Sequence, residues 1–244
     1  HLYSDEAFTI CKYMSDEYKE KFNLNCREFV NSVAVRENVK QNGDMKYTIS
    51  YLGNLHSNRW KALVEIGEAL DCINNEREKK VILKIYSGSN LEKNIRHILE
   101  SIDSINLMGS VSPELVREKQ LEADILVHVE AFDRPSVNST RLSLSTKIPE
   151  YLSTGVCMFA YGPSNIASMK YLYENSLAQV CFEKSALKAA LQQLIDNSEL
   201  RETYAMNGYR YAKQFHDIDI VSGAFQHEIF VKGNNYEENR IICT

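Results

Sequence analysis

Residues 48–88 read TISYLGNLHSNRWKALVEIGEALDCINNEREKKVILKIYSG, and this stretch decides the fold. Two short apolar runs, residues 48–53 and 81–88, each end in Gly, and between them apolar side chains recur at helical spacing from Arg59 to about Asn74. Short apolar runs joined by amphipathic helices are typical of parallel strands whose sheet is covered on both faces. The stretch therefore predicts a strand, a helix and a second strand of a parallel sheet.

The same alternation continues along the chain to about residue 215. Further strands are predicted in INLMG, DILVHV, VCMFAYG and LAQVCF, and helices after Asn90, from Pro113, after Pro163, from Ser185 and from Ser198. Strands that alternate with helices in this way indicate the α/β class. We therefore expect a doubly wound, Rossmann-like parallel sheet over residues 45–213.

The segments on either side of this domain are less regular. Residues 4–22, SDEAFTICKYMSDEYKEKF, show helical spacing behind a Ser/Asp cap, and an extended piece is expected around residues 29–35. Residues 1–44 are interpreted as the end of a preceding domain, closed by a charged linker at residues 36–44. Residues 214–244 predict a C-terminal helix, which either packs on the central domain or crosses to another one, and a solvated tail.

The composition excludes several classes of function. With 28 basic and 33 acidic residues the formal net charge is −5, so the chain offers no diffuse positive field for nucleic acid. The longest uncharged stretch, residues 151–169, contains Gly and Pro and does not read as a membrane span. Six cysteines lie far apart without a C-x-x-C pair, which favours a reduced, cytoplasmic protein over a secreted or zinc-binding one.

Motifs for common cofactors and nucleophiles are also missing from the sequence. There is no G-x-G-x-x-G after the first strand, no P-loop, no G-x-S-x-G, and no H-E-x-x-H among the six histidines. We therefore expect neither a bound cofactor nor a metal ion. His56 follows a strand and is a candidate to line the site, whereas His128 is interpreted as a packed strand residue.

Ligands of open parallel sheets bind beyond the carboxyl ends of the strands, which directs attention to four places. These are the loop at Gly53, the loop of residues 108–110, the loop of residues 130–144 and the start of STKIPEYLSTG, residues 145–155.

In STKIPEYLSTG, Ser145 or Thr146 is expected to cap a short helix that Gly155 ends. The open N-terminus of this helix and the charge of Lys147 would stabilise a phosphate. Glu150 falls on the same side as Thr146 and Lys147, where its carboxylate can accept two hydrogen bonds from a vicinal diol such as a ribose. The alternative is a capped surface helix with an internal Lys147–Glu150 ion pair, and the residues alone favour it.

The Gly53 loop, GNLHSNRWK, leads into a helix that Ser57 or Asn58 is expected to cap. Gly53 lets the backbone approach a ligand closely, and Arg59 falls in the first helical turn, where a guanidinium suits a diphosphate. The alternative is an exposed Arg59 on a helix whose buried face is formed by Trp60, Leu63, Val64, Gly67 and Leu70.

Three stretches together resemble one known family. YLGNLHSNRWK is similar to its G-R-L-x-x-x-K-G loop, INLMGSVSPELVREKQLEADILVHV to its base-binding loop, helix and strand, and STKIPEYLSTGVCMFAYGP to its E-A-x-x-x-G-x-P-V segment. The chain thus resembles the C-terminal, donor-binding half of a two-domain GT-B glycosyltransferase of the "glycosyltransferases group 1" type, a family that builds bacterial polysaccharides. The opening residues are similar to the last helix and strand before the interdomain linker.

The resemblance implies roles for particular residues. Glu150 would hold the ribose hydroxyls, the segment of Ser145, Thr146 and Lys147 would face the diphosphate, and Arg59 stands where the family has a phosphate-binding Lys. The nucleobase would lie against the main chain from Met108 through Gly109 to Val111.

Two departures from the family pattern also matter. Asn54 takes the place of an expected phosphate-binding Arg, and Leu142 takes the place of the first Glu of the family's E-x7-E motif. The stereochemical course therefore does not follow from that motif. Glu130 or Asp133, just before it, are candidates to contact the donor sugar.

The leading hypothesis is a domain that binds a nucleoside-diphosphate sugar for glycosyl transfer, of hexosyltransferase type, in polysaccharide biosynthesis. Arg59, Lys147 and a helix N-terminus would stabilise the departing diphosphate without a metal. The resemblance implies that the acceptor site belongs to an N-terminal domain, so this chain is expected to bind donor without efficient turnover; it also allows peripheral membrane association of the full-length protein. Two alternatives stay open, a noncatalytic interaction module and one half of a sugar-nucleotide epimerase.

Overall fold

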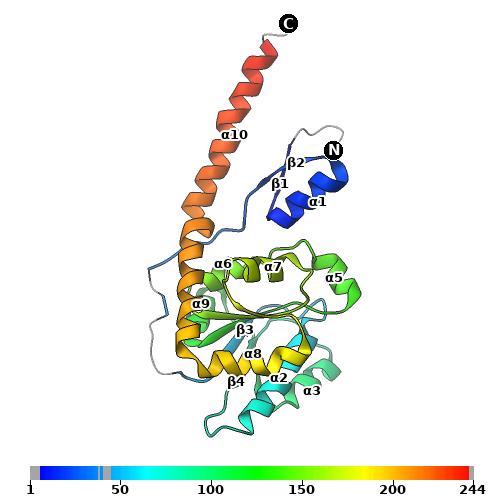
Figure 1. Ribbon diagram of the computed structural model, residues 1–244, viewed down its shortest axis with the longest axis vertical. Coiled ribbons are helices and arrows are strands. Elements are labelled where there is room, and N and C mark those ends of the chain that lie inside the picture. Colours follow the sequence, from blue (N-terminus) through cyan, green and yellow to red (C-terminus); the bar gives the residue numbers. More distant parts are fainter. Residues whose placement is uncertain (1–5, 38, 41–44, 242–244) are drawn as a thin grey trace.

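A computed structural model describes residues 6–37, 39–40 and 45–241 of the chain. At its centre lies a sheet with helices around it (Figure 1). The sheet is parallel and has six strands in the order β5-β4-β3-β6-β7-β8. The strands are β3 (Thr48–Leu52), β4 (Ile82–Tyr86), β5 (Ile105–Gly109), β6 (Ile125–Val129), β7 (Cys157–Tyr161) and β8 (Gln179–Cys181). If the six strands are numbered from one by their order along the chain, their order in the sheet is 3-2-1-4-5-6, which is that of a doubly wound fold. The predicted α/β class is therefore confirmed.

Helices cover both faces of the sheet, because side chains along each strand alternate between two apolar clusters. One cluster packs α2 (Arg59–Asn74), α3 (Lys93–Glu100) and α8 (Lys184–Asp196) against the strands. The other lies under α4 (Pro113–Glu122), α6 (Lys147–Leu152) and α7 (Ala167–Glu174), while α9 (Ser198–Tyr211) contacts β7 and α6. The predicted helix bounds from Arg59, Pro113 and Ser198 agree with the structure.

The sheet opens between its two central strands. β3 and β6 pair only through Ile49 with Ile125 and Ser50 with Leu126, so they diverge toward their carboxyl ends. Gly53 donates its N–H to β4, which directs the N–H and C=O of Leu52 toward the open β6 side. The buried Tyr151 hydroxyl fills this gap, accepting from Leu52 N at 2.9 Å and donating to Leu52 O at 3.0 Å. Helix α6, which carries Tyr151, is thereby fixed to the end of β3.

The N-terminal segment differs from its prediction. Residues 4–22 are not one helix: β1 (Glu6–Thr9) precedes α1 (Lys12–Phe22), and the expected Ser/Asp cap lies outside the described residues. β1 pairs in parallel with β2 (Asn25–Glu28), and the Phe8 ring packs edge-on against other aromatic rings. These tertiary contacts favour a strand where apolar spacing alone indicated a helix.

The extended piece expected at residues 29–35 is also misplaced. The strand ends at Glu28, and within residues 29–35 only Val33 forms a bridge, to Asp217. Of the linker at residues 36–44, the described positions 36, 37, 39 and 40 have no helix or strand, and the rest lie outside the described residues.

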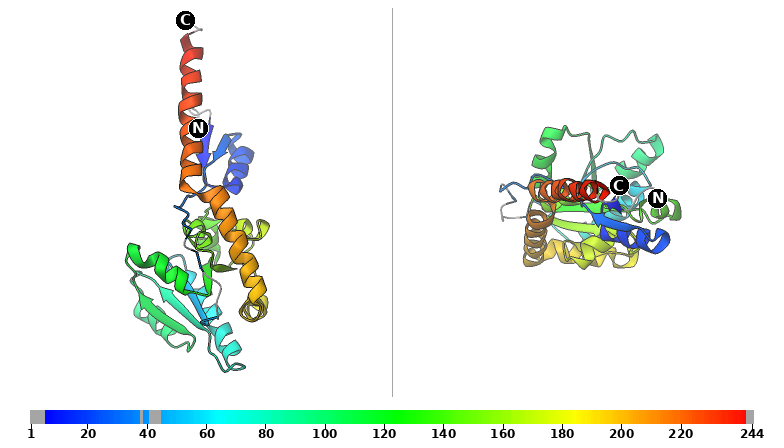
Figure 2. Two further views of the ribbon diagram at one scale, coloured as in Figure 1. Left: turned by 90° about the vertical axis from the view of Figure 1, so that its left-hand side faces the viewer. Right: turned by 90° about the horizontal axis from the view of Figure 1, so that it is seen from above.

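At the C-terminal end, a π-helical turn η1 (Ala212–His216) leads into α10 (Ile218–Ile241), which includes the residues expected as a tail. Helix α10 runs away from the sheet and alongside β1 and β2 (Figures 1 and 2). Phe225 packs against Phe8 and Phe29, and Glu228 forms an ion pair with Arg27 at 2.5 Å. The helix therefore crosses to the N-terminal segment. Within the described residues, none of the helices is long and apolar enough to span a bilayer.

Candidate functional site

The candidate site lies where the sheet reverses its winding direction. Gly53 follows β3 and Glu130 follows β6, and these two strands are the neighbours from which the chain proceeds in opposite directions. In doubly wound sheets this switch point, at the carboxyl ends of the strands, leaves a crevice that helices do not cover.

A cavity of about 300 Å³ occupies this crevice. Because Tyr151 anchors α6 from below, Lys147 and Glu150 on that helix face the cavity. The loop after β3, the loop after β4, the loop after β5 and helix α4 complete the wall. The lining residues are Leu52, Gly53, Tyr86, Ser87, Gly88, Ser110, Val111, Val116, Gln120, Lys147 and Glu150.

Lys147 presses its ammonium group against Gly53. A Cβ atom at position 53 would stand 2.6 Å from Lys147 Nζ and 2.9 Å from the Tyr51 hydroxyl oxygen, so a side chain there would have to displace the Lys147 ammonium group. Burial lowers the pKa of Lys147, and the neighbouring charge of Arg59 lowers it further, while the carboxylates of Glu150 and Glu130 oppose the shift. The ammonium is thus a partly desolvated cation, which interacts strongly with an incoming anion.

Glu150 lies one helical turn from Lys147 in the same cavity. Burial raises the pKa of its carboxyl group, whereas the charge of Lys147 and a hydrogen bond from Gln120 lower it. The carboxylate therefore depends on these two neighbours to stay ionised in a partly dry environment.

Arg59 stands beside the cavity, at the start of α2, and is held by two acceptors. Its guanidinium donates to Glu130 Oε2 at 3.0 Å and to Asn54 Oδ1 at 3.3 Å. Glu130 is 3% exposed, and its other oxygen lies 3.4 Å from both His128 Nε2 and Ser168 Oγ. Burial acts to raise the pKa of Glu130, but His128 and Arg59 outweigh it and hold the pKa below its usual value.

The loop of residues 130–144 contains an unpredicted helix, α5 (Arg134–Thr140). Asp133 caps it by accepting from Ser136 N at 3.1 Å, and it also accepts from the Asn58 amide at 3.0 Å. Asn58 takes the N-cap position of α2 as expected, but its side chain makes no capping hydrogen bond: Ser57 and Asn58 both have left-handed backbone, and the Asn58 amide links the two loops instead. Neither Glu130 nor Asp133 lines the cavity.

The N-terminus of α6 differs from its prediction in one respect. Thr146 is exposed, makes no capping hydrogen bond and does not line the cavity that Lys147 and Glu150 line. Ser145 supplies the partners instead: its hydroxyl accepts from Lys147 N at 3.4 Å and its carbonyl from Ile148 N at 3.1 Å. These N–H groups are already engaged, and the charge that the helix offers comes from the Lys147 side chain.

Among the residues expected at the nucleobase, Val111 lines the cavity, while the exposed Met108 and Gly109 do not. His56 is exposed and outside the lining, and His128 is a buried strand residue as expected. Sequence reasoning missed Ser87 and Gly88, although they directly follow β4 and the carboxyl-end rule identifies them. It also missed that Gln120 lines the cavity, because most residues of helix α4 are polar and a glutamine among them is typical of a helix surface.

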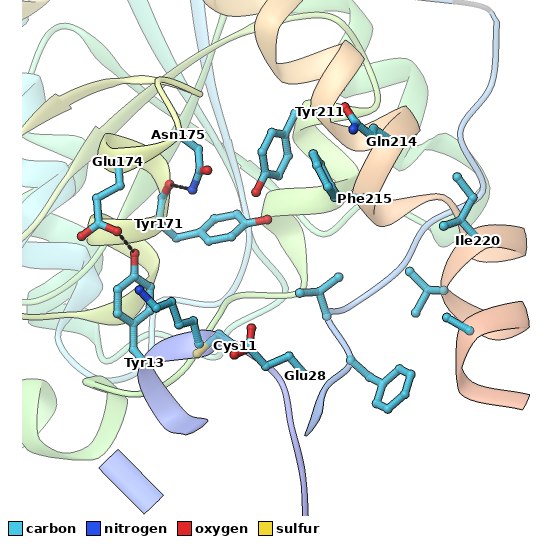
Figure 3. Close-up of a pocket in the computed structure, with 15 residues that line it drawn as sticks. Cys11, Tyr13, Glu28, Tyr171, Glu174, Asn175, Tyr211, Gln214, Phe215 and Ile220 are labelled. Carbon is cyan, nitrogen blue, oxygen red and sulfur yellow. Dashed lines mark hydrogen bonds between the residues drawn. The ribbon is translucent and has the colours of Figure 1, made fainter. Parts of the chain in front are cut away.

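A second cavity of about 640 Å³ lies between the N-terminal segment, α7 and α10 (Figure 3). Several of its polar groups are paired with one another or with the surrounding chain: Tyr13 donates to Glu174 at 2.7 Å, and the Tyr171 hydroxyl lies 2.8 Å from His216 Nε2. Aromatic and aliphatic side chains form much of the remaining lining. The smaller cavity at the switch point, with Lys147 and Glu150 directed into it, is the better candidate for a polar, charged ligand. In the described part of the chain, no group of three or more His, Cys, Asp or Glu side chains is arranged to hold a metal ion.

No protein-family model and no curated protein matches the sequence. Solved structures do match. TarM from S. aureus, in a mutant structure that contains UDP, has a TM-score of 0.73 at 11% identity over 91% of this chain. WaaG, a glycosyltransferase of lipopolysaccharide biosynthesis, has a TM-score of 0.65 at 12% identity over 90%, and the pneumococcal O-GlcNAc transferase GtfA, in complex with UDP and GlcNAc, 0.67 at 13% over 91%.

This chain spans only part of those proteins, 43% of TarM, 44% of GtfA and 61% of WaaG. The similarity covers both the six-stranded parallel sheet and the segments on either side of it, because nine-tenths of the chain is matched. The chain therefore has the fold of a GT-B glycosyltransferase domain.

Proposed function

We propose that this chain is the donor-binding part of a glycosyltransferase and holds a nucleoside-diphosphate sugar at the switch point of its sheet. The observation that carries the proposal is the placement of Lys147 and Glu150 on one helix, both facing one cavity beside Gly53. A partly desolvated ammonium suits a diphosphate, and a half-buried carboxylate suits the two hydroxyls of a ribose. Solved structures of the same fold that contain UDP support the proposal.

The charges at the site favour glycosyl transfer over simple nucleotide storage. When a sugar leaves a nucleoside diphosphate, negative charge develops on the diphosphate, and cations fixed nearby stabilise it. The charge of Arg59 lowers the pKa of Lys147, so the two cations lie near each other. The sugar acceptor would be bound by residues beyond this chain, since the chain spans about half of the solved proteins that it resembles. Transfer to a glycan in polysaccharide synthesis, by a hexosyltransferase, is the reaction we propose for the longer protein.

Isothermal titration calorimetry with UDP, ADP, GDP and CDP tests the donor site. We expect at least one of them to bind, and Lys147→Met and Glu150→Gln each to weaken binding about tenfold or more, because a hydrogen bond to a charged group contributes about 1.5–3 kcal/mol. Lys188→Met is the matched control, since Lys188 lies on α8, away from the cavity, and forms an exposed ion pair with Glu76. Absence of heat with all four nucleotides would refute the proposal.

The same titrations address the alternative of a noncatalytic interaction module. The loss of Arg at position 54 and of Glu at position 142 motivates that alternative. If Lys147→Met and Glu150→Gln bind nucleotides as tightly as the unaltered chain, the cavity is not a donor site and the interaction module is favoured. Product analysis on the longer protein separates transfer from epimerisation, because a transferase releases free nucleoside diphosphate and an epimerase returns a sugar nucleotide.

A further inference from the structure

Two side-chain contacts cross the open centre of the sheet, from the start of α2 to the loop after β6. The Asn58 amide donates to Asp133 at 3.0 Å, and the Arg59 guanidinium donates to Glu130, also at 3.0 Å. Because β3 and β6 pair only near their amino ends, these contacts hold the two carboxyl-end loops together. They fix the first turn of α2 relative to the loop after β6.

Glu130 is a rigid support for the contact with Arg59. Its side chain is buried, its backbone N–H donates to Tyr161 O in β7 at 3.0 Å, and its second carboxylate oxygen accepts from Ser168 Oγ at 3.4 Å. A Cβ atom at Gly162 would stand 2.9 Å from Glu130 Cβ, so the chain packs closely around this residue. The carboxylate therefore stays in place, and the guanidinium adopts the orientation that the carboxylate requires.

The guanidinium of Arg59 is held through both of its terminal nitrogens. Nη2 donates to Glu130 Oε2, and Nη1 donates to Asn54 Oδ1 at 3.3 Å. Two acceptors from separate loops fix the plane of this rigid fork. The two contacts use two of the five N–H groups of a guanidinium, and the side chain is 19% exposed, so further donors are within reach of a ligand.

The order of the groups along the crevice places Arg59 near a second phosphate. Glu150 and Lys147 line the cavity one helical turn apart, and Lys147 Nζ reaches the space beside Gly53. The next residue, Asn54, is the one that binds the Arg59 guanidinium. A nucleotide with its ribose at Glu150 and its first phosphate at Lys147 therefore extends its second phosphate toward Arg59.

We propose that Glu130 is a positioning residue, which holds the Arg59 guanidinium so that its remaining N–H groups meet the second, sugar-bearing phosphate of the donor. Glu130 thereby makes the site selective for nucleoside diphosphates over monophosphates. This inference rests on the proposed function and deepens it. Glu130 acts through Arg59 and does not itself bind the phosphate, because a carboxylate repels an anion.

The test compares a nucleoside diphosphate with its monophosphate. From UDP, ADP, GDP and CDP, the one that binds the unaltered chain most tightly is titrated by calorimetry together with the corresponding monophosphate. We expect the diphosphate to bind about tenfold or more tightly than the monophosphate. In Glu130→Gln this ratio of affinities should fall to about threefold or less, while the affinity for the monophosphate stays within about twofold.

Variants of Arg59 test whether Glu130 acts through it. Arg59→Met should lower the ratio to about threefold or less, and Glu130→Gln added to Arg59→Met should lower it no further. Arg59→Lys keeps the charge but loses the fork, so the ratio should fall here too, and an unchanged ratio would overturn the inference. Because Arg59→Lys leaves the buried Glu130 in place, it decides the question even if Glu130→Gln does not fold.

Glu65→Gln is the matched control, because it also removes one negative charge from a partly buried position. Glu65 lies on α2, accepts from the Tyr161 hydroxyl at 2.6 Å, pairs with Lys184 at 3.2 Å and does not line the cavity. We expect the ratio of affinities in this variant to match that of the unaltered chain.

The direction of the change separates positioning from simple neutralisation of charge. Removing a negative charge without loss of position would leave diphosphate binding as tight as before or tighten it, and that result in Glu130→Gln would overturn the inference. An equal loss of affinity for both nucleotides, or a fall in the ratio that persists in the Arg59→Met background, would overturn it as well.

Two results with the unaltered chain distinguish this inference from the proposed function. Equal binding of the diphosphate and the monophosphate overturns the contact with the second phosphate and leaves the donor site intact. If none of the four nucleoside diphosphates binds, both the donor site and this inference fail.

Discussion

Replacing Tyr151 by Phe tests how α6 is anchored to the sheet. The Tyr151 hydroxyl is the hydrogen-bonding partner of both Leu52 N and Leu52 O, at 2.9 and 3.0 Å, in a gap that β6 does not reach. Phe keeps the ring and leaves no cavity, so only the two hydrogen bonds are lost. Each buried backbone group left without a partner costs about 1–3 kcal/mol. We therefore expect the free energy of unfolding to fall by about 2–4 kcal/mol.

For a chain of this length, each kcal/mol lowers the thermal midpoint by about 2–4 °C, so Tyr151→Phe should unfold about 5–15 °C earlier. The assay is thermal unfolding followed by far-ultraviolet circular dichroism. Tyr204→Phe is the control: its hydroxyl donates at 3.1 Å to the Gln179 side chain at a half-buried position, where water can replace it. We expect the control to lose less than about 1 kcal/mol. If Tyr151→Phe melts no earlier than Tyr204→Phe, the anchoring role is refuted.

Two further predictions concern the ligand. Gly53→Ala should displace the Lys147 ammonium group and weaken nucleoside-diphosphate binding about tenfold. In a double-mutant cycle measured by calorimetry, Gly53→Ala should cause no further loss of affinity once Lys147 is replaced by Met. Additive losses of affinity would contradict the contact between Gly53 and Lys147. Burial raises the pKa of Glu150, although Lys147 and Gln120 act to lower it. Protonation of Glu150 at lower pH therefore removes the carboxylate that would accept hydrogen bonds from the ribose hydroxyls. The ratio of the affinity for a nucleoside diphosphate to that for its 2′,3′-dideoxy form should fall as the pH is lowered from 8 to 5, and it should be independent of pH in Glu150→Gln.

The sequence predicts the sheet and its helices well, because hydrophobic periodicity over long segments leaves few alternatives. The helix at Arg59–Asn74 begins and ends where its pattern does, and the carboxyl-end rule leads to Gly53, Lys147 and Glu150 in one cavity. Short segments whose conformation depends on distant partners are predicted poorly. Phe8 lies in a strand because of contacts with residues far along the chain.

Local capping rules fail at this site for a related reason. Asn58 is a suitable cap by its residue type, but the nearby Asp133 carboxylate binds its amide and the backbone adopts a left-handed turn. Gln120 gives no signal in VREKQLE, because a glutamine among charged residues is typical of a helix surface. Its burial follows only from the way α4 meets α6. A residue's role in binding thus depends on pairings between elements, which a single sequence does not record.

The distribution of charge around the cavity assigns different roles to its two cations. The pKa of Glu130 lies below its usual value, so this carboxylate is ionised at neutral pH and neutralises Arg59, which it contacts at 3.0 Å. Lys147 faces Glu150, whose pKa is raised, and this carboxylate opposes a cation less completely. The positive potential available to a diphosphate therefore comes mainly from Lys147, while Arg59 contributes directed N–H donors that Glu130 and Asn54 leave free. The buried carboxylate of Glu130 supplies a physical reason for arginine rather than lysine at position 59, since a guanidinium can bind Glu130 and still present further donors.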